Sequence, residues 1–310
     1  MTSTSKQRSK TSIQQHSPCA SCGPELPTAK TALVAEGGGQ RGVFTAGILD
    51  AWLNAGFNPF EILIGTSAGA QNLSSYMTCQ PGFGLNAITE LSSQPQFFKW
   101  QRSLIGKHAV DLDWYFDQLN SAASQLDISR GHSRLQQRQL YFSATRSDNR
   151  RAEFFSPDKD NWLAMLKASS ALPMLYKGGV KIGEHFYVDG GLSAPLPVEE
   201  AYQRGAREIT VLRTVSEEAS LTSPWLHKIK SMICSQHYCP KVIDLITHHE
   251  DSYQKNLAFI NNPPADVTIH QIFPQQPLAS SLVGSQPQAL KQDYQLGLAA
   301  GVAYLQQAQG

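Results

Sequence analysis

The stretch EILIGTSAGA, residues 61–70, joins a run of apolar residues to a serine between glycines. Residues 62–64 predict a buried strand, and residues 68–77 have the apolar spacing of a helix. Ser67 therefore falls at the tip of a sharp turn between the two. This turn, Gly65-Thr66-Ser67-Ala68-Gly69, matches the G-x-S-x-G pattern, in which glycines let a strained strand-to-helix turn expose a nucleophilic serine.

A second glycine-rich turn precedes the first and has the same setting. Residues 33–35 predict a short buried strand, and residues 43–55 predict a helix that ends at Gly56. The loop between them consists of Gly37, Gly38, Gly39, Gln40, Arg41 and Gly42. Two strand–loop–helix units in succession predict an α/β fold, in which a mostly parallel sheet carries helices on its faces.

The rest of the chain continues this alternation after a stretch without a clear pattern. The sequence predicts strands at 139–145, 151–155, 186–189 and 208–212, and helices at 161–169 and 198–205. Beyond Thr214 the pattern turns helical, with one late strand at 266–273 and a closing helix at 288–307. We expect a disordered polar tail over 1–30, an α/β core over 31–205, and a mostly helical C-terminal region over 206–310 packed on the core.

Composition excludes some partners. A chain of 310 residues with 41% hydrophobic content can bury a large core. Its 26 Lys and Arg residues balance 25 Asp and Glu residues, so the net charge is +1 and we expect no nucleic acid partner. The sequence contains no run of 18 apolar residues, so we expect no membrane-spanning helix. The N-terminal residues lack the apolar segment of a secretory signal.

The cysteines favour a reducing compartment, and we expect the protein in the cytoplasm. There are five of them, an odd number in a chain too large to need disulfides. A zinc site is the alternative, with Cys19, Cys22, Cys234 and Cys239 as ligands. The two pairs differ in spacing, however, and the first lies in the polar tail. We therefore expect unpaired thiols and no metal.

The glycine loop also satisfies G-x-G-x-x-G, the fingerprint of a dinucleotide site. That interpretation requires an acidic residue at the end of the next strand to hold a ribose. The next strand ends in the serine turn instead, and its only acid, Glu61, stands at its start. Backbone N–H groups between a strand and a helix suit an oxyanion as well as a phosphate. We therefore interpret residues 37–42 and Ser67 as one acyl-transfer site without a cofactor.

A serine hydroxyl is a poor nucleophile until a base takes its proton. A late histidine is the usual base, and the candidates are His237, His248, His249 and His270. None of these histidines lies in a loop that resembles the loop of a catalytic histidine. His249 belongs to the apolar stripe of a helix, which indicates core packing. Asp189 stands at a strand end before Gly190 and Gly191, which let the backbone turn around its carboxylate. We favour Asp189 and keep His185, on the same strand face, as second choice.

The motifs EGGGQRGVFTAG, LIGTSAGAQNLS and KASSALP, with the Asp189 turn, resemble the patatin-like phospholipase family, in particular its bacterial branch. The resemblance runs from about Thr31 and is firmest up to Gly205. It implies a three-layer α/β/α fold that hydrolyses lipid acyl esters with a Ser-Asp dyad and no histidine. By position, it implies that Ser67 is the nucleophile and Asp189 the base. It assigns the oxyanion hole to the backbone N–H groups of Gly38, Gly39 and their neighbours.

Two positions depart from the plant members of this family. Glu36 replaces the aspartate before the glycines, and Gly191 replaces the alanine that usually ends the aspartate turn. Both variants resemble the bacterial branch, and neither changes the dyad. No motif after Gly205 indicates an acyl-chain pocket or a head-group preference.

A lipid hydrolase meets its substrate at an interface, and two segments are candidates for contact with a membrane surface or for a lid. Residues 97–105, FFKWQRSLI, and residues 225–233, WLHKIKSMI, mix large apolar and basic side chains. The alternative is ordinary packing with solvated charges.

Three functions remain open. The first is a serine acyl hydrolase that cleaves fatty acyl esters of phospholipids or other lipids through an acyl-Ser67 intermediate. The second is a transacylase, in which the same dyad moves the acyl group to an alcohol or thiol. The third is a catalytically idle lipid-binding protein. The intact motifs favour the first, and a nucleotide-binding protein is a distant fourth.

Overall fold

The computed structural model describes residues 30–121, 124–135, 138–216 and 240–308. Its centre is an eight-stranded sheet of order β5-β6-β3-β2-β1-β7-β8, with β4 paired to β3 beside that path. The strands are β1 (Lys30–Ala35), β2 (Ile62–Thr66), β3 (Gln139–Arg146), β4 (Ala152–Phe155), β5 (Val180–Ile182), β6 (His185–Asp189), β7 (Ala206–Leu212) and β8 (Thr268–Ile272). Strands β3, β2, β1, β7 and β8 run parallel, whereas β4, β5 and β6 pair antiparallel. The mostly parallel sheet is therefore confirmed.

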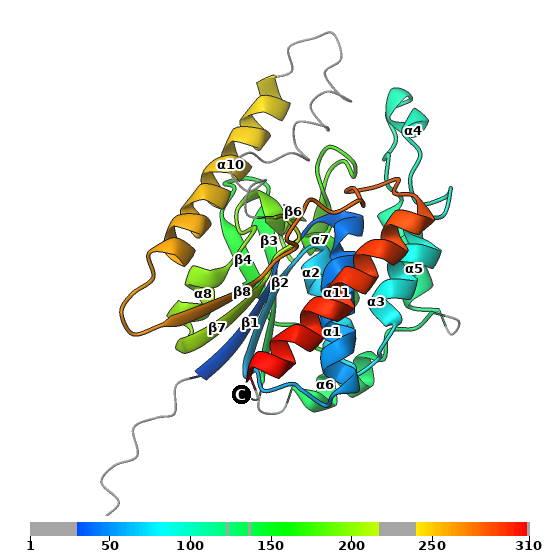
Figure 1. The fold of residues 1–310 in the computed structure, drawn as a ribbon. Coiled ribbons are helices and arrows are strands. Elements are labelled where there is room, and N and C mark those ends of the chain that lie inside the picture. The colour runs from blue at the N-terminus through cyan, green and yellow to red at the C-terminus, as the bar shows by residue number, and fades with distance from the viewer. Residues whose placement is uncertain (1–29, 122–123, 136–137, 217–239, 309–310) are drawn as a thin grey trace, which may run out of the picture.

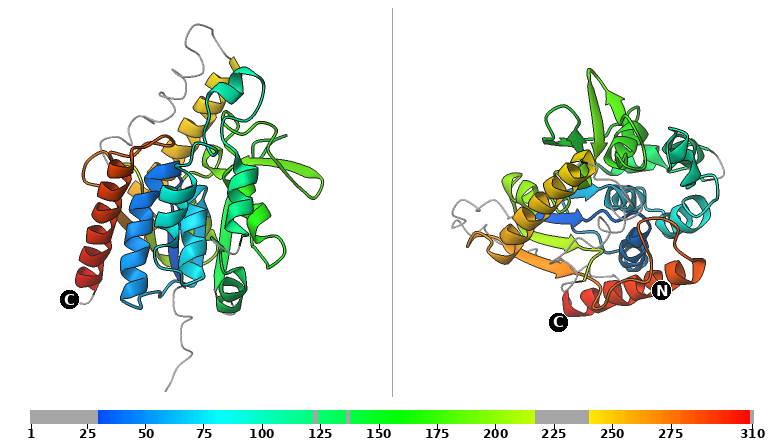
Figure 2. Two further views of the ribbon diagram at one scale, coloured as in Figure 1. Left: turned by 90° about the vertical axis from the view of Figure 1, so that its right-hand side faces the viewer. Right: turned by 90° about the horizontal axis from the view of Figure 1, so that it is seen from above.

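Helices cover both faces of the sheet, which gives the three layers of an α/β/α fold (Figures 1 and 2). One face carries α8 (Val198–Gln203) and α10 (Pro240–Asn261). The other carries α1 (Gly42–Asn54), α2 (Ala68–Met77), α7 (Trp162–Ser169) and α11 (Pro287–Ala308). The shorter segments are η1 (Gly39–Arg41), α3 (Phe83–Asn86), the π-helical η2 (Ala87–Leu91), α4 (Gln101–Leu104), α5 (Leu112–Leu119), α6 (Ile128–Arg134) and η3 (Gly190–Leu192).

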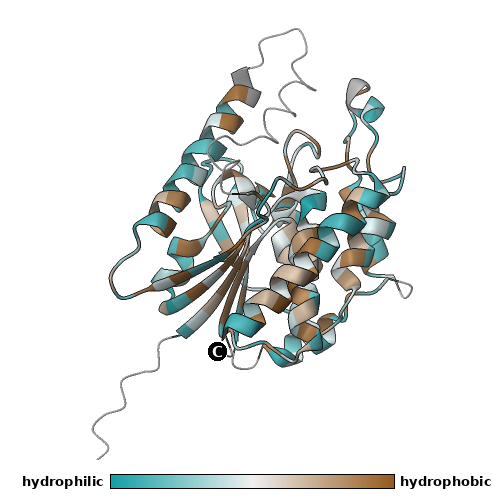
Figure 3. Cartoon of the chain, viewed as in Figure 1, coloured by the Kyte–Doolittle hydropathy of each residue, from teal (hydrophilic) through white to brown (hydrophobic). Residues whose placement is uncertain are grey.

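Neighbouring residues of the central strands point to opposite faces of the sheet. In β1, Leu33 and Ala35 belong to the hydrophobic cluster with α1 and α2, whereas Ala32 and Val34 belong to the cluster with α8 and α10. All four side chains are fully buried. A strand covered on both faces is apolar throughout rather than alternating. Figure 3 shows brown stretches in the middle of the sheet, with polar residues on the helices and toward the edge of the sheet.

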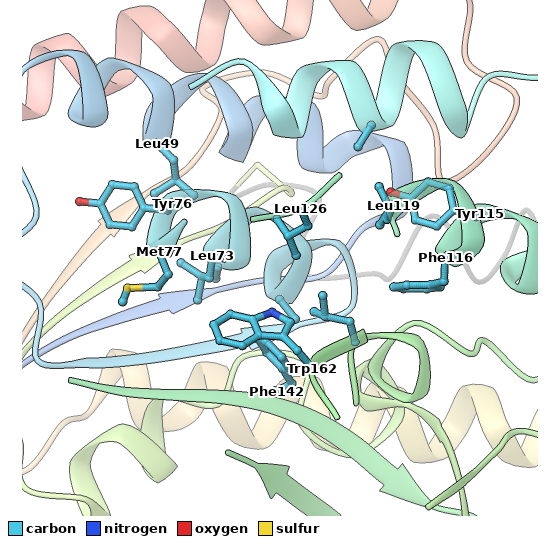
Figure 4. Close-up of a cluster of buried hydrophobic side chains, with 14 of the residues drawn as sticks. Leu49, Leu73, Tyr76, Met77, Tyr115, Phe116, Leu119, Leu126, Phe142 and Trp162 are labelled. Carbon is cyan, nitrogen blue, oxygen red and sulfur yellow. The ribbon is translucent and has the colours of Figure 1, made fainter. Parts of the chain in front are cut away.

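The larger of these clusters fills the space between the sheet and α2, α5 and α7. Trp162 and Phe142 stack edge to face there, with ring centroids 5.9 Å apart (Figure 4). The indole N–H of Trp162 donates to Ser74 Oγ at 3.0 Å, so its polar atom is satisfied. Leu119 and Leu126, at another side of this cluster, also line the pocket described below. The core and the pocket therefore share a wall.

The last helix, α11, packs against α1 at very short range. A Cβ at Gly297 of α11 would lie 2.0 Å from the carbonyl oxygen of Phe44, and one at Gly47 of α1 would lie 2.3 Å from that of Tyr294. Glycine on both helices lets the backbones approach this closely. The C-terminal end of the chain is thereby joined to the first helix of the fold.

Every strand and helix named from the sequence is present, within a few residues of the expected bounds. The segments without a clear pattern hold short elements that the sequence analysis did not resolve. Helix α5 is one of them, although it had a start signal: the carboxylate of Asp111 accepts the N–H of Trp114 at 3.1 Å, as an N-cap does.

The sheet extends past residue 205, where the sequence placed the end of the α/β core. Strand β7 pairs with β1 in the middle of the sheet, and β8 pairs with β7 at its edge. The region after 205 therefore supplies two strands as well as α10 and α11. The motifs end before β7, and strand pairing between distant segments leaves no local signal by which the sequence could place it.

Some of the sequence expectations fall outside the described residues. They concern the polar tail up to residue 29, the segment 225–233, His237, and the cysteines Cys19, Cys22, Cys234 and Cys239. Within the described part of the chain, Cys79 is a free thiol. None of the helices described there has both the length and the apolar composition needed to cross a membrane.

Candidate active site

Ser67 lies in the turn between β2 and α2 and has an unusual backbone conformation. Its φ of 53° and ψ of −122° lie outside the regions that L residues ordinarily adopt. The glycines on either side of it leave no room for a side chain. A Cβ at Gly65 would lie 2.5 Å from Ala70 Cα, and one at Gly69 would lie 2.3 Å from the oxygen of Ala35. The strained turn expected from G-x-S-x-G is present.

Side-chain hydrogen bonds hold this turn from both sides. Thr66 Oγ1 donates to the carbonyl oxygen of Ala194 at 2.8 Å and lies 2.7 Å from Ser143 Oγ. The backbone N–H of Ser67 donates to Ser169 Oγ at 2.9 Å. Ala68 follows as the first residue of α2, where the N–H groups have no acceptor one turn earlier. The surroundings therefore fix the strained serine and leave a donor beside it.

The hydroxyl of Ser67 donates to the carboxylate of Asp189, with Oγ and Oδ2 2.8 Å apart. Asp189 is the last residue of β6, and its own N–H donates to the oxygen of Ala171 at 3.0 Å. Its second oxygen, Oδ1, accepts the N–H of Gly191 at 2.7 Å. The fold thus brings together two residues that are 122 positions apart in the sequence.

The environment of Asp189 makes its carboxylate a better proton acceptor than an ordinary aspartate. The residue is 6% exposed. Burial raises the pKa of Asp189 to about 6, although the hydrogen bonds from Gly191 and Ser67 lower it. The carboxylate is therefore ionised at neutral pH, while its conjugate acid is less acidic than usual, and both properties suit a general base.

The glycine loop lies against the serine turn. A Cβ at Gly37 would be 3.2 Å from Ser67 Cβ. Gly38 and Gly39 have φ values of +152° and +57°, which favour glycine. The loop is held by the segment that follows β7, because Thr214 donates through Oγ1 to the oxygen of Gly37 at 2.8 Å.

The structure narrows the set of backbone donors that the sequence assigned to this loop. The N–H of Gln40 donates to the oxygen of Leu282, that of Arg41 to the oxygen of Gly38, and that of Gly42 to carbonyls inside η1. These three groups are used within the fold. Among the described residues, the N–H groups at positions 37–39 have no protein acceptor, so they are the donors that remain free for an oxyanion.

Of the two glycines after Asp189, Gly190 packs too closely on Ser143 for any other residue, and Gly191 lies close to the carboxylate of Asp189. A Cβ at Gly190 would lie 2.2 Å from Ser143 Oγ, and one at Gly191 would lie 2.9 Å from Asp189 Oδ1. An alanine at position 191 would therefore press on the carboxylate itself. The oxygen of Gly191 is 2.5 Å from Nδ1 of His249, which is buried.

The histidines considered as bases have other surroundings. His185 lies at the opposite end of β6 from Asp189, and its Nδ1 accepts from Arg146 at 3.1 Å. His270 Nε2 lies 3.9 Å from Glu208 Oε1, and His248 contacts Ser193. His249 is a core residue of α10, as its apolar stripe indicated, although it also contacts the aspartate turn.

Ser67 and Asp189 open onto an apolar pocket between the sheet and the helices α2, α5 and α7. The empty space in the pocket and at its mouth is about 900 Å³. Its walls include Phe83, Ile88, Phe97, Val110, Leu166 and Leu175. Figure 4 labels Tyr115, Leu119 and Leu126, which also line it. The lining is apolar, as a site for a hydrocarbon chain requires.

Gln71, in the wall of this pocket near the serine turn, has protein partners for its amide. Gln71 Nε2 donates to Ser170 Oγ at 2.9 Å, and its Oε1 accepts the hydroxyl of Tyr115 at 2.6 Å. Because both ends of the amide are bonded, it presents little unsatisfied polarity to a ligand.

A smaller and more polar pocket lies on the other side of Ser67 and Asp189. Glu36, Arg41 and His249 line it, together with Gly37 and Gly38. Leu172 and Leu282 line both pockets. The serine therefore stands at a junction between an apolar chamber and a polar one.

Several groups at this site carry no motif and were missed by the sequence analysis. Ser169 belongs to the KASSALP motif, whose resemblance to the family indicates no role for this serine. Leu282 acts through its backbone oxygen, so no residue type could have indicated it. His249 was interpreted as core packing, and its contact with Gly191 depends on how α10 lies on the sheet.

A parallel sheet with a strained serine at a strand-to-helix turn defines the nucleophile-elbow class of α/β proteins. Residues 33–202 match the patatin-like phospholipase family, and residues 239–309 match a domain of unknown function, DUF6363. The chain is 39% identical over 284 residues to the uncharacterised protein YjjU of Escherichia coli K12, covering 89% of this chain and 77% of that protein. The chain therefore belongs to the patatin-like phospholipase family.

Among solved structures, this chain is similar to VipD from Legionella pneumophila, with 13% identity and a TM-score of 0.43 over 91% of this chain and 67% of that one.

Proposed function

We propose that the protein hydrolyses fatty acyl esters of lipids through an acyl-serine intermediate on Ser67, with Asp189 as the general base. The observation that carries this proposal is the 2.8 Å hydrogen bond from Ser67 Oγ to Asp189 Oδ2 at the mouth of an apolar pocket. Membership of the patatin-like phospholipase family supports a lipid acyl ester as the substrate.

In the first step, Ser67 Oγ attacks the ester carbonyl carbon while its proton moves to Asp189 Oδ2. The carbonyl oxygen becomes an oxyanion, for which the N–H groups of Gly38, Gly39 and Ala68 are the candidate donors. When the ester C–O bond breaks, the leaving alcohol takes the proton from Asp189. The acyl group then remains on Ser67, and its chain lies in the apolar pocket.

In the second step, a water molecule attacks the acyl-serine carbonyl and gives its proton to Asp189. The proton returns to Ser67 Oγ as the fatty acid leaves, so the dyad ends in its starting state. Each step needs an ionised carboxylate first and a protonated one afterwards. A carboxyl group with a pKa of about 6 serves both needs better than one near 4.

The test is incubation of the purified protein with a panel of phospholipids, neutral glycerides and short p-nitrophenyl esters, with the Ser67→Ala variant as control. We expect free fatty acid from the wild type alone, and labelling of Ser67 by a fluorophosphonate. Added alcohol or thiol acceptors reveal a transacylase if they divert the acyl group into a new ester. Absence of both turnover and labelling would revive the idle lipid-binding protein and contradict the proposal.

We further propose that the loop around α4 contacts an anionic membrane surface. Ile105 is 71% exposed, the highest value among the large hydrophobic side chains of the described residues. Gly106 follows it with φ +81°, and Lys99 and Lys107 are exposed nearby. The loop projects from the body of the molecule (Figure 1). An exposed apolar tip with flanking lysines is suited to the interface of an anionic bilayer.

This loop is continuous with the wall of the apolar pocket. Phe98 and Val110 form the bridge that closes the base of the loop, and Phe97 and Val110 line the pocket. Phe97 is buried, so ordinary packing describes that end of the segment 97–105. Insertion of the tip would therefore bring the membrane close to the chamber that takes the acyl chain.

Sedimentation with phosphatidylglycerol-containing vesicles tests the loop. Ile105→Asp should weaken binding about tenfold, since it removes the aliphatic side chain that would enter the bilayer and adds a negative charge. Leu296→Asp is the matched control, because Leu296 is also exposed, at 47%, but lies on α11. Equal binding by both variants and the wild type would contradict the membrane contact and leave the dyad proposal intact.

A further inference from the structure

Three side chains of helix α10 contact the chain segment that follows Asp189. His249 Nδ1 lies 2.5 Å from the oxygen of Gly191, His248 Nε2 lies 2.9 Å from Ser193 Oγ, and Asn256 Oδ1 accepts the N–H of Leu196 at 3.1 Å. The helix belongs to the part of the chain that matches a domain of unknown function. These contacts give that region a direct connection to the candidate base.

The direction of the first hydrogen bond follows from its acceptor. A carbonyl oxygen has no proton to give, so Nδ1 of His249 carries the hydrogen and donates. Burial lowers the pKa of His249 to about 4, with Arg41 and His248 adding to the effect, while the bond to Gly191 opposes it. The ring is therefore neutral at working pH, in the tautomer with the hydrogen on Nδ1.

The same residue that accepts from His249 donates to the base. The N–H of Gly191 points at Asp189 Oδ1, 2.7 Å away. Both peptide groups that flank the Gly191 Cα are thus anchored, one by the carboxylate and the other by the imidazole. A glycine without such anchors has more backbone freedom than any other residue, so its N–H would hold the carboxylate less firmly.

Resting on the proposed function above, we propose that His249 is a positioning residue for Asp189, and that it acts by fixing the backbone of Gly191 on the carbonyl side, so that the N–H of Gly191 stays bonded to the carboxylate. The region over 239–309 then has a role in this chain. It holds the catalytic base, Asp189, in position, although the reacting side chains themselves lie within residues 33–202.

Several charged or titratable groups face this arrangement and must be considered in any pH profile. Glu36 and Arg41 face it from the glycine loop, since both line the polar pocket with Asp189 and His249. His248 is the neighbour on α10 itself. Glu36 and Arg41 are unchanged in all the variants, and His248 is changed only in its own control. The effects of these groups on the pH profile are therefore the same in the wild type and in the two His249 variants.

The test is the pH dependence of kcat/KM on a water-soluble p-nitrophenyl ester, for the wild type and for His249→Phe, His249→Asn and His248→Phe. Phenylalanine keeps the ring and removes the donor, whereas the asparagine amide places a donor near the position of Nδ1. His248→Phe is the matched control, because it removes a contact from the same helix to the same segment without touching Gly191.

We expect the acidic limb of the profile to move to higher pH in His249→Phe by about half to one unit, because a weaker bond from Gly191 no longer lowers the pKa of Asp189 as much. His249→Asn should restore most of the shift, and His248→Phe should leave the limb in place. At pH 6 the phenylalanine variant should be about two- to sixfold slower than the wild type.

A uniform loss of rate with an unmoved limb in His249→Phe would show a merely structural role and overturn the inference, as would equal limbs for the phenylalanine and asparagine variants. If His249→Phe does not fold, as judged by thermal unfolding, His249→Leu replaces it, since leucine also lacks the donor. A wild-type protein that neither cleaves esters nor reacts with a fluorophosphonate overturns the proposed function and the inference with it. An active wild type with unmoved limbs overturns the inference alone.

Discussion

The two halves of the chain contribute to the candidate site in different ways. Residues 33–202 carry the side chains that would react, Ser67 and Asp189, and the glycines around them. The C-terminal half contributes contacts that hold these groups: the oxygen of Leu282 accepts the N–H of Gln40 at 2.9 Å, and His249 donates to the Asp189 turn. In the proposed function the first half would supply the reacting side chains, and the second half holds them in position. Substitutions in the two halves should therefore have effects of different size and kind.

The largest effect is expected at Ser67. Ser67→Ala removes the nucleophile and should lower kcat by at least about 10⁴-fold, because no covalent intermediate can form. The fold should survive, since the Ser67 backbone N–H remains bonded to Ser169. Ester hydrolysis and thermal unfolding measure the two properties. Substantial residual turnover with normal fluorophosphonate labelling elsewhere would move the nucleophile to another residue.

Asp189→Asn should come second. The amide cannot accept the Ser67 proton as a carboxylate does, so we expect kcat/KM to fall by about 10³- to 10⁴-fold. His185→Ala is the matched control on the same strand and should change kcat/KM little, because its ring contacts Arg146. An active asparagine variant together with an inactive His185→Ala would reverse the assignment of the base.

Protonation of Asp189 at low pH should lower kcat/KM by less than the Asp189→Asn substitution does. Burial raises the pKa of Asp189 from its usual range to about 6. The base works only when deprotonated, so kcat/KM should be constant above that pH and fall about tenfold per unit below it. Stopped assays with a p-nitrophenyl ester between pH 4.5 and 8, corrected for enzyme inactivation, give the profile. A limb near pH 4 would mean that solvent reaches the carboxylate during catalysis.

The difference between the halves also explains what the sequence could predict. Ser67, Asp189 and the glycine loop were predicted because each needs a particular residue type at a particular turn. Gly65 and Gly69 touch backbone atoms at distances that no other residue allows. The apolar patterns of the central strands and of the helices also predicted these elements directly. A sheet that is covered on both faces requires apolar strands and helices with an apolar face.

The remaining groups depend on packing between distant segments, which residue types do not encode. Any residue could supply the carbonyl oxygen of Leu282, and the buried Glu36 holds Thr214 across 178 positions of sequence. The apolar pocket is likewise assembled from many separate segments between positions 39 and 283. For the same reason, the sequence could not show that the N–H groups of residues 40–42 in the glycine loop are bonded inside the fold.

The smallest effect on activity, and the sharpest test of the role given to the C-terminal half, is expected at Gly297 of α11. Alanine usually stabilises a helix interior by about 0.5–1 kcal/mol relative to glycine. Here its Cβ would lie 2.0 Å from the backbone oxygen of Phe44, which cannot move aside as a flexible side chain would. We therefore expect Gly297→Ala to destabilise the fold by about 1–3 kcal/mol, against the helix preference.

At a temperature where this variant is folded, its kcat/KM should remain near the wild-type value, because Gly297 packs on α1 and is absent from the lining of both pockets. Leu296→Ala, at an exposed neighbour, is the control and should change the unfolding midpoint little. A single, cooperative transition at a lowered temperature would mean that α11 unfolds together with the sheet. An early transition of part of the protein that leaves esterase activity intact would instead detach the C-terminal half from the site and contradict the supporting role inferred for it.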